Sequence, residues 1–282
     1  MKESLFILVQ YLLPQQLLSR LVGVIARCRA GWVRKPFISW FVRRYGVDME
    51  EARETDPHAY RDFIDFFTRE LRPGARPLPQ DESAVVCPAD GAISQLGTID
   101  EGLLLQAKGR QFSAEQLLGG DAERAQMYST GNFMTVYLAP RDYHRVHMPL
   151  GGTLRQMRYV PGKLFSVNHT TAEHVPDLFA RNERVICHFD TDRGPMTMVL
   201  VGAMIVAGVE TVWAGEVCPG NRQAFTRDYS EHSPLIQIPR GEEMGRFKLG
   251  STVILLFPPD AVEFHPDLAP GDRVRMGQAI TS

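Results

Sequence analysis

Beyond residue 83, the chain alternates short runs of β-branched, aromatic and aliphatic residues with interruptions rich in Gly and Pro. This texture constrains the fold strongly, because such runs form strands of layered sheets rather than long helices. The runs are AVVCPADGAISQLGTI, NFMTVYLAP, GTLRQMRYV, ERVICHF, PMTMVLVGAMIVAGVETVWAG and FKLGSTVILLF. Between them only SAEQLLGG looks helical, so we predict a mostly β domain.

The segment RPGARPLP, residues 72–79, separates this domain from a region with helical patterns. Proline clusters interrupt both helices and sheets, which makes this segment the best domain boundary in the chain. Just before it, a helix is expected to start at Asp56-Pro57 and to run through HAYRDFIDFFTREL. The predicted fold class is α+β, with a helical region over residues 1–72 and a mostly β catalytic domain over residues 73–282.

The net charge of −2 hides a basic N-terminal segment. Residues 1–47 contain eight Lys or Arg and one Glu, a net charge of +7, which leaves −9 for the remainder. A local basic excess favours an anionic partner surface, either a membrane or a nucleic acid. Because the arginines alternate with large aliphatic residues, we predict membrane lipid as the partner and no nucleic acid.

Two stretches of this segment are amphipathic at a spacing of about 100° per residue. The apolar face of the first stretch contains Leu17, Leu18, Leu21, Val22 and Ile25, and Arg20 and Arg27 lie opposite. The apolar face of the second stretch contains Phe37, Ile38, Phe41, Val42 and Tyr45, near Trp32 and Trp40. Pro14 breaks the first stretch, which is too short for a spanning helix of about 20 apolar residues. The pattern predicts helices that lie in the membrane interface. Core-facing helices and an organellar transit peptide remain the alternatives.

Three polar residues stand out in the β domain. Asp90 follows a hydrophobic run in CPADGAI, where an ordinary turn aspartate is the alternative. His144 and His147 lie in APRDYHRVHMP, and they share a face only if this stretch is a helical turn starting at Pro140. An HxxH pair can also bind zinc, but no third ligand is recognisable nearby, so we predict no metal.

Gly250-Ser251 interrupts the apolar run RFKLGSTVILLF. A strand kink or bulge is the simplest interpretation of a glycine there. Asp90, a histidine and Ser251 could also form a triad, although the hydrolase pattern G-x-S-x-G is absent. A serine on a strand is poorly presented to an external substrate, but it can reach the carbonyl of Gly250, which has no Cβ to obstruct the approach.

The four cysteines, Cys28, Cys87, Cys187 and Cys218, lack CxxC pairing and zinc-ligand spacing. They indicate reduced thiols in a cytosol-facing protein.

Five motifs in order, PADG, YHRVHMP, GKLFSVN, FARNERV and FKLGST, together resemble the bacterial, pyruvoyl-dependent phosphatidylserine decarboxylases. The resemblance extends along nearly the whole chain, through SLFILVQYLLPQ, QAKGRQFS and VETVWAG. It implies a compact, mostly antiparallel and barrel-like sheet. It also implies a peripheral enzyme at the cytoplasmic face of the cell membrane, with phosphatidylserine as its substrate.

The resemblance further implies that Ser251 attacks the Gly250 carbonyl, with His147 as base and Asp90 orienting that base. The chain is then cut into residues 1–250 and 251–282, which remain associated noncovalently; a homodimer of this processed unit is a further expectation. Ser251 becomes a pyruvoyl group, the covalent cofactor, which forms a Schiff base with phosphatidylserine. Loss of carbon dioxide and protonation yield phosphatidylethanolamine.

His144 has no part in that triad, and we assign it as the proton donor in decarboxylation, because imidazole can supply a proton near neutral pH. A structural role in the turn is the alternative. Two other classes of protein stay open on the sequence: a membrane-bound serine esterase that uses the same three residues without self-cleavage, and a membrane scaffold without chemistry.

Overall fold

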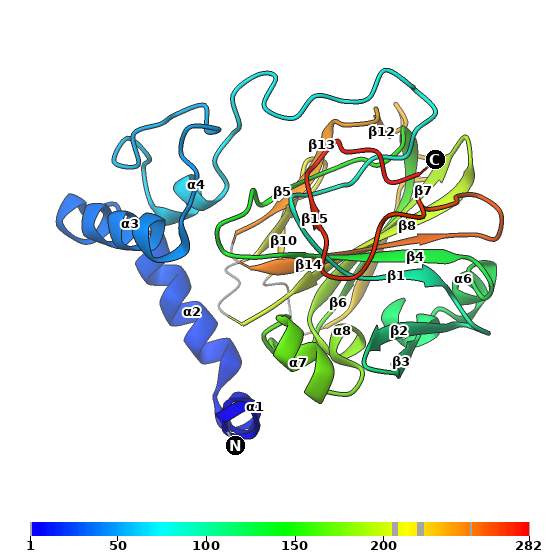
Figure 1. Cartoon of the computed structure of the whole chain (residues 1–282), viewed down its shortest axis with the longest axis horizontal. Coiled ribbons are helices and arrows are strands. Elements are labelled where there is room, and N and C mark those ends of the chain that lie inside the picture. Colours follow the sequence, from blue (N-terminus) through cyan, green and yellow to red (C-terminus); the bar gives the residue numbers. More distant parts are fainter. Residues whose placement is uncertain (1, 205–207, 219–222, 249, 282) are drawn as a thin grey trace.

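The computed structural model describes residues 2–204, 208–218, 223–248 and 250–281 (Figure 1). An arm of three helices extends from a β-rich body, so the predicted α+β class is confirmed. The arm contains α1 (Lys2–Leu12), α2 (Gln15–Ala26) and α3 (Gly31–Tyr45), and α4 (Phe63–Phe67) packs beside α3. Four short helices border the body: α5 (Ala114–Leu117), α6 (Ala122–Met127), α7 (His169–His174) and α8 (Leu178–Arg181).

The main sheet has nine strands, which pair antiparallel in the order β11-β6-β7-β8-β14-β4-β1-β15, with β12 beside β6. Its strands are β1 (Gly91–Thr98), β4 (Asn132–Leu138), β6 (Gly152–Val160), β7 (Arg184–Thr191), β8 (Gly194–Gly202), β11 (Phe225–Asp228), β12 (Gln237–Ile238), β14 (Ser251–Phe257) and β15 (Arg273–Val274). The predicted antiparallel sheet is confirmed. The expected barrel-like form needs correction, because within the described residues the order has two ends, β11 and β15, that do not pair with each other.

A second sheet has the order β10-β9-β13-β5, and β2 pairs with β3 in a separate hairpin. The bounds of these strands are β2 (Leu103–Ala107), β3 (Arg110–Ser113), β5 (Arg145–His147), β9 (Val209–Thr211), β10 (Gly215–Cys218) and β13 (Glu243–Phe247). The run RFKLGSTVILLF is therefore not one strand: β13 and β14 belong to different sheets, and Ser251 begins β14. Leu249 lies outside the described residues.

β14 occupies the centre of the main sheet, between β8 and β4. Every residue of this strand is buried. Val253 and Leu255 face one apolar core, whereas Ile254 and Leu256 face a second core on the opposite side of the sheet. A strand buried on both faces is held by two layers of packing and by hydrogen bonds to two neighbours. Ser251 therefore lies at the end of one of the most firmly held segments of the chain.

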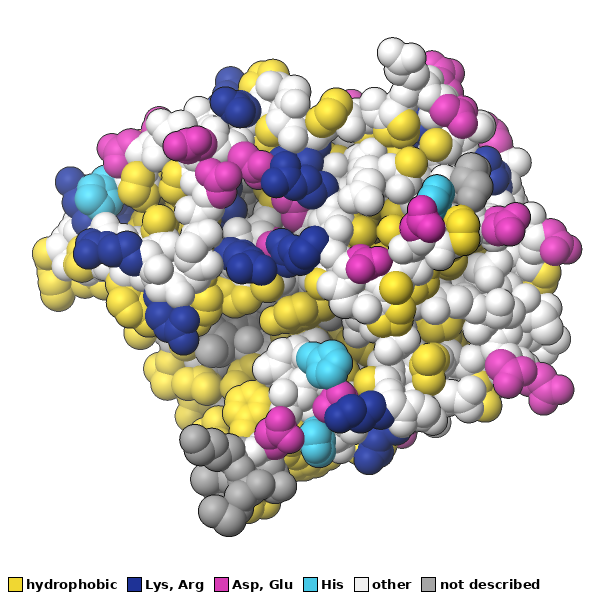
Figure 2. Space-filling model, in the orientation of Figure 1, with side chains coloured by type: hydrophobic (Ala, Val, Ile, Leu, Met, Phe, Trp, Pro, Cys, Tyr) yellow, Lys and Arg dark blue, Asp and Glu magenta, His cyan; other side chains and the backbone are white. Residues whose placement is uncertain are grey.

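The N-terminal helices bury the predicted apolar face of α3 and leave three of the five residues of the α2 face exposed. On α3, Ile38 and Phe41 are buried against the aromatic rings of α4, so this face is core-facing and its assignment to the membrane was wrong. On α2, Leu17, Leu21 and Ile25 are 57%, 55% and 51% exposed. Figure 2 shows hydrophobic side chains along the left edge of the molecule, over the helical arm. No helix within the described residues has the length and apolar character that crossing a bilayer requires.

Two buried glutamines attach the arm to the body. The side-chain oxygen of Gln10 accepts from the Ser166 N–H at 2.8 Å, and its amide nitrogen donates to the Thr171 hydroxyl at 3.2 Å. The side-chain oxygen of Gln15 accepts from the Leu164 N–H at 2.8 Å. These bonds explain why polar residues interrupt an otherwise apolar helix: they satisfy buried backbone groups of the segment 164–171.

The helix expected from Asp56-Pro57 is shorter than predicted. It begins only after Asp62, whose side chain accepts from the Asp65 N–H at 2.9 Å and caps α4. The helical SAEQLLGG is confirmed, since Ser113 caps α5 through the Gln116 N–H.

Candidate active site

Ser251 is fully buried at the first position of β14, where it pairs with Leu138 of β4 and Gly202 of β8. Its hydroxyl has no hydrogen-bond partner among the described residues. Gly250 has a φ of +33°, a left-handed value that residues with a Cβ rarely adopt. The site thus places an unbonded buried hydroxyl directly after a glycine in a backbone conformation that other residues rarely adopt.

His144 is fully buried beside the segment that leads to Ser251. Its carbonyl accepts from the Phe247 N–H at 2.9 Å, three residues before Gly250. Its Nδ1 donates to the Asp142 carbonyl at 2.8 Å, and its ring packs on Phe67 with centroids 4.0 Å apart. Because burial lowers the pKa of His144 to about 3, the ring is neutral at physiological pH. Its Nε2 then bears a lone pair, and nothing in the described part of the chain bonds to it.

His147 is also held in one tautomer. Its Nδ1 donates to the Gly241 carbonyl at 2.8 Å, so Nε2 is the acceptor for the Tyr143 hydroxyl at 3.1 Å. Burial lowers the pKa of His147, which keeps this ring neutral as well. The expected helical turn is wrong, because β5 covers residues 145–147 and pairs with β13. The two histidines therefore lie on an extended segment, where residues three apart point in opposite directions.

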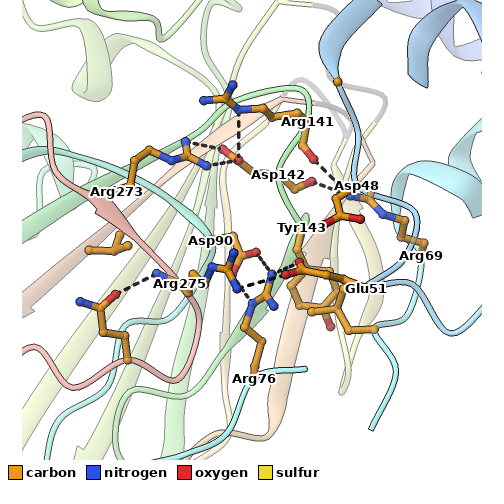
Figure 3. A pocket seen from close by; sticks show the side chains of 14 residues that line it. Asp48, Glu51, Arg69, Arg76, Asp90, Arg141, Asp142, Tyr143, Arg273 and Arg275 are labelled. Atoms are coloured by element: carbon orange, nitrogen blue, oxygen red, sulfur yellow. Dashed lines mark hydrogen bonds and ion pairs between the residues drawn. The ribbon is translucent and has the colours of Figure 1, made fainter. Parts of the chain in front are cut away.

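Asp90 lies in a network of ion pairs rather than on a histidine (Figure 3). Its carboxylate accepts from Arg76 Nε at 2.9 Å and from the Met276 N–H at 2.8 Å. Arg76 also pairs with Glu51 at 2.6 Å. Within the described contacts, no hydrogen bond joins Asp90 to His147, and the Nδ1 of His147 donates to the carbonyl of Gly241 instead.

The loop with Asp90 and the strand with His147 are nevertheless neighbours. The His147 N–H donates to the carbonyl of Pro88 at 2.8 Å, two residues before Asp90. Residues from the C-terminal segment complete the network, since Arg273 pairs with Asp142 at 2.6 Å and Arg275 pairs with Glu51 at 3.1 Å.

Several site residues were missed by the sequence reasoning. Asp142 and Tyr143 lie inside the motif APRDYHRVHMP, so their position between the predicted residues was a usable signal. Arg76 lies in the proline-rich segment and was interpreted only as part of a domain boundary. As for a metal, the described residues contain no group of three His, Cys, Asp or Glu side chains that could bind one.

Comparison with known proteins relates the whole chain to one group. A family model described as phosphatidylserine decarboxylase matches residues 63–282, and a second model, described as PSD, matches residues 5–46. The phosphatidylserine decarboxylase proenzyme of Ectopseudomonas mendocina is 61% identical over 99% of this chain and 98% of the relative. The proenzymes of Pseudomonas aeruginosa strain LESB58 and Pseudomonas putida strain GB-1 are 61% and 59% identical, each over 99% of this chain, and 97% and 98% of their own lengths. A likeness of this extent and degree identifies the chain as a member of the phosphatidylserine decarboxylase family.

Proposed function

We propose that this chain is a phosphatidylserine decarboxylase proenzyme, which cuts itself between Gly250 and Ser251 and then converts phosphatidylserine to phosphatidylethanolamine and carbon dioxide. The observation that carries the proposal is the buried, unbonded hydroxyl of Ser251 next to a glycine with positive φ. Neither the esterase nor the scaffold alternative finds support in the comparisons, because the three relatives described above are named as proenzymes of the decarboxylase.

The proposed self-cleavage needs only water and no external oxidant or reductant. The Ser251 oxygen forms a bond to the Gly250 carbonyl carbon, the peptide C–N bond breaks, and the nitrogen takes the hydroxyl proton, which gives an ester. Loss of the Ser251 α-proton expels the Gly250 carboxylate and leaves a dehydroalanine at position 251. Water then adds to its imine tautomer and ammonia leaves, so residue 251 becomes a pyruvoyl group.

His147 is proposed as the base for these steps. Its neutral ring can take a proton at physiological pH, and the Gly241 carbonyl fixes the tautomer in which Nε2 is the acceptor. The Tyr143 hydroxyl occupies that nitrogen in the uncut chain and has to turn aside. Asp90 is proposed to orient His147, which the backbone bond between His147 and Pro88 supports, because it fixes the Asp90 loop beside β5.

The position of residue 251 suits a pyruvoyl group, because β4 and β8 hold the start of β14 in the buried centre of the sheet. The pyruvoyl ketone supplies an electron-withdrawing carbonyl for the amine of the substrate. His144 is proposed to move the proton: its free Nε2 accepts one from the substrate ammonium and returns it to the carbon that has lost carbon dioxide.

The helical region, residues 1–72, is proposed to dock the enzyme on the membrane from the cytoplasmic side without spanning it. The support is the exposed apolar face of α2 together with Trp32 and Trp40, which are 84% and 52% exposed. Tryptophan is typical of membrane interfaces, where its ring is half apolar and half hydrated.

Product formation tests this function. Purified protein is mixed with phosphatidylserine in detergent micelles, and phosphatidylethanolamine and carbon dioxide are measured, with Ser251→Ala as the control. We expect equal amounts of both products from the unaltered chain and none from Ser251→Ala. Release of fatty acid or headgroup instead would contradict a decarboxylase and favour the esterase.

A further inference from the structure

Arg69, just after α4, has a buried charge that pairs with no carboxylate among the described residues. Its side chain is 4% exposed, and only its Nη2 is bonded, at 3.1 Å from the Arg141 carbonyl and 3.5 Å from the Asp142 carbonyl. Nε and Nη1 have no acceptor in the part of the chain that the structure describes. The guanidinium also contacts the ring of Phe66, whose centroid is 5.7 Å from Cζ.

An unpaired buried cation is among the least favourable arrangements in a folded protein. Lysine or histidine can escape the cost by losing a proton, but a guanidinium remains charged at any physiological pH. Water can satisfy free N–H groups without neutralising the charge. An anionic ligand does both, so the free nitrogens of Arg69 point to one.

Arg69 lines a pocket of about 380 Å³ in which five arginines face four carboxylates (Figure 3). Three of these carboxylates are already paired: Asp90 and Glu51 with Arg76, and Asp142 with Arg273. The fourth carboxylate, Asp48, is exposed. Arg141 lies at the open side, with a side chain 54% exposed and its nearest carboxylate 3.9 Å away. Five arginines against four carboxylates leave the pocket one unmatched positive charge, and Arg69 and Arg141 are the two arginines outside its close ion pairs.

A second pocket also borders Arg69, but its charges cancel. Three arginines and three carboxylates line it, and among them Glu70 pairs with both Arg53 and Arg145. An anion is therefore expected only in the first pocket.

We propose that Arg69 and Arg141 bind the phosphate group of a phosphate monoester or diester in the first pocket, which Asp90 and Tyr143 of the candidate active site also line. A phosphate has several oxygens, which can accept from two guanidinium groups at once. The source is either a phospholipid headgroup or free phosphate, which share this chemistry. This site goes beyond the proposed decarboxylation and does not depend on it.

Thermal unfolding of the full chain tests the site, with inorganic phosphate compared with chloride at equal ionic strength. A ligand that binds only the folded state raises Tm, here by about 5 °C at about 100 times its dissociation constant. Arg69→Gln should abolish this rise and leave Tm in chloride unchanged or higher, because it removes an unpaired charge. Arg72→Gln is the matched control: Arg72 is exposed, lines neither pocket, and should keep the full rise.

A second probe and a second variant complete the test. Dihexanoyl phosphatidylglycerol, used as a monomer below its micelle concentration, presents a phosphate diester without a membrane. If Tm rises with this lipid but not with inorganic phosphate, the ligand of the site is a lipid headgroup. If Tm rises with inorganic phosphate, the site recognises the phosphate group itself. If Arg69→Gln does not fold, the exposed Arg141→Gln should reduce the rise. No rise with either probe, or an equal rise in these variants, overturns the site.

Discussion

Replacing Asp90 by asparagine should destabilise the fold and slow self-cleavage. The Asp90 and Arg76 side chains are 9% and 5% exposed, and removing one partner of a buried ion pair costs about 3–5 kcal/mol. The asparagine keeps one acceptor oxygen and Arg76 keeps Glu51 at 2.6 Å, so we expect the lower end, about 3 kcal/mol. For a chain of this size, that loss corresponds to a Tm about 6–12 °C lower.

The assay separates stability from chemistry by using two backgrounds. In Ser251→Ala the chain cannot cut itself, so denaturant unfolding compares one covalent state with and without Asp90→Asn. In the unaltered background, gels taken over time measure the rate of cutting. Arg53→Gln is the matched control, because the Arg53–Glu70 pair is 72% and 47% exposed and should contribute at most about 1 kcal/mol. A cost for Asp90→Asn no larger than that of Arg53→Gln, with cutting at the normal rate, would refute both the buried pair and the role of Asp90.

The other predictions concern the histidines and the helical arm. His147→Ala should remain uncut, with a loss of orders of magnitude in rate, as for triad bases in hydrolases; normal processing would remove His147 as the base. His144→Ala should still cut itself but form phosphatidylethanolamine far more slowly per cleaved molecule, and unchanged turnover would leave His144 a structural residue. The pKa of His144 is about 3 in the folded chain and about 6.5 in the unfolded chain, so the unfolded chain binds more protons between these two pH values. The free energy of unfolding should therefore fall as the pH drops below about 6.5. The same free energy of unfolding at pH 7 and pH 5 would contradict this. Leu21→Glu, on the exposed face of α2, should weaken flotation with anionic liposomes, and added salt should weaken binding of the unaltered chain; binding insensitive to both would speak against docking by the arm.

Local patterns predicted the elements but not the contacts between them. The strand composition predicted the antiparallel sheet, and the Ser113 cap marked α5, because both signals act within a few residues. The amphipathic spacing of α3 was detected correctly, yet periodicity cannot say what an apolar face meets, and Phe41 meets α4 rather than lipid.

In the candidate site too, local patterns identified residues but not their partners. Asp90 and Ser251 were singled out by their local context, but the partner of Asp90 depends on how distant segments come together. Arg76 and Met276 approach it from 14 and 186 residues away, which no spacing rule anticipates. The chain does turn at Pro140, where the Asp142 N–H donates to the Ala139 carbonyl, but the helical turn needed to place both histidines on one face is absent, because pairing with β13 makes residues 145–147 extended whatever their local preference.

The covalent state of the purified, active protein shows most directly whether the chain cuts itself between Gly250 and Ser251. Mass spectrometry under denaturing conditions, before and after treatment with borohydride, measures both the chain lengths and the carbonyl. We expect a chain of residues 1–250 and a chain of residues 251–282 that resists N-terminal sequencing and gains the mass of two hydrogens on reduction. A fully active preparation with one intact chain and no reducible carbonyl would contradict it.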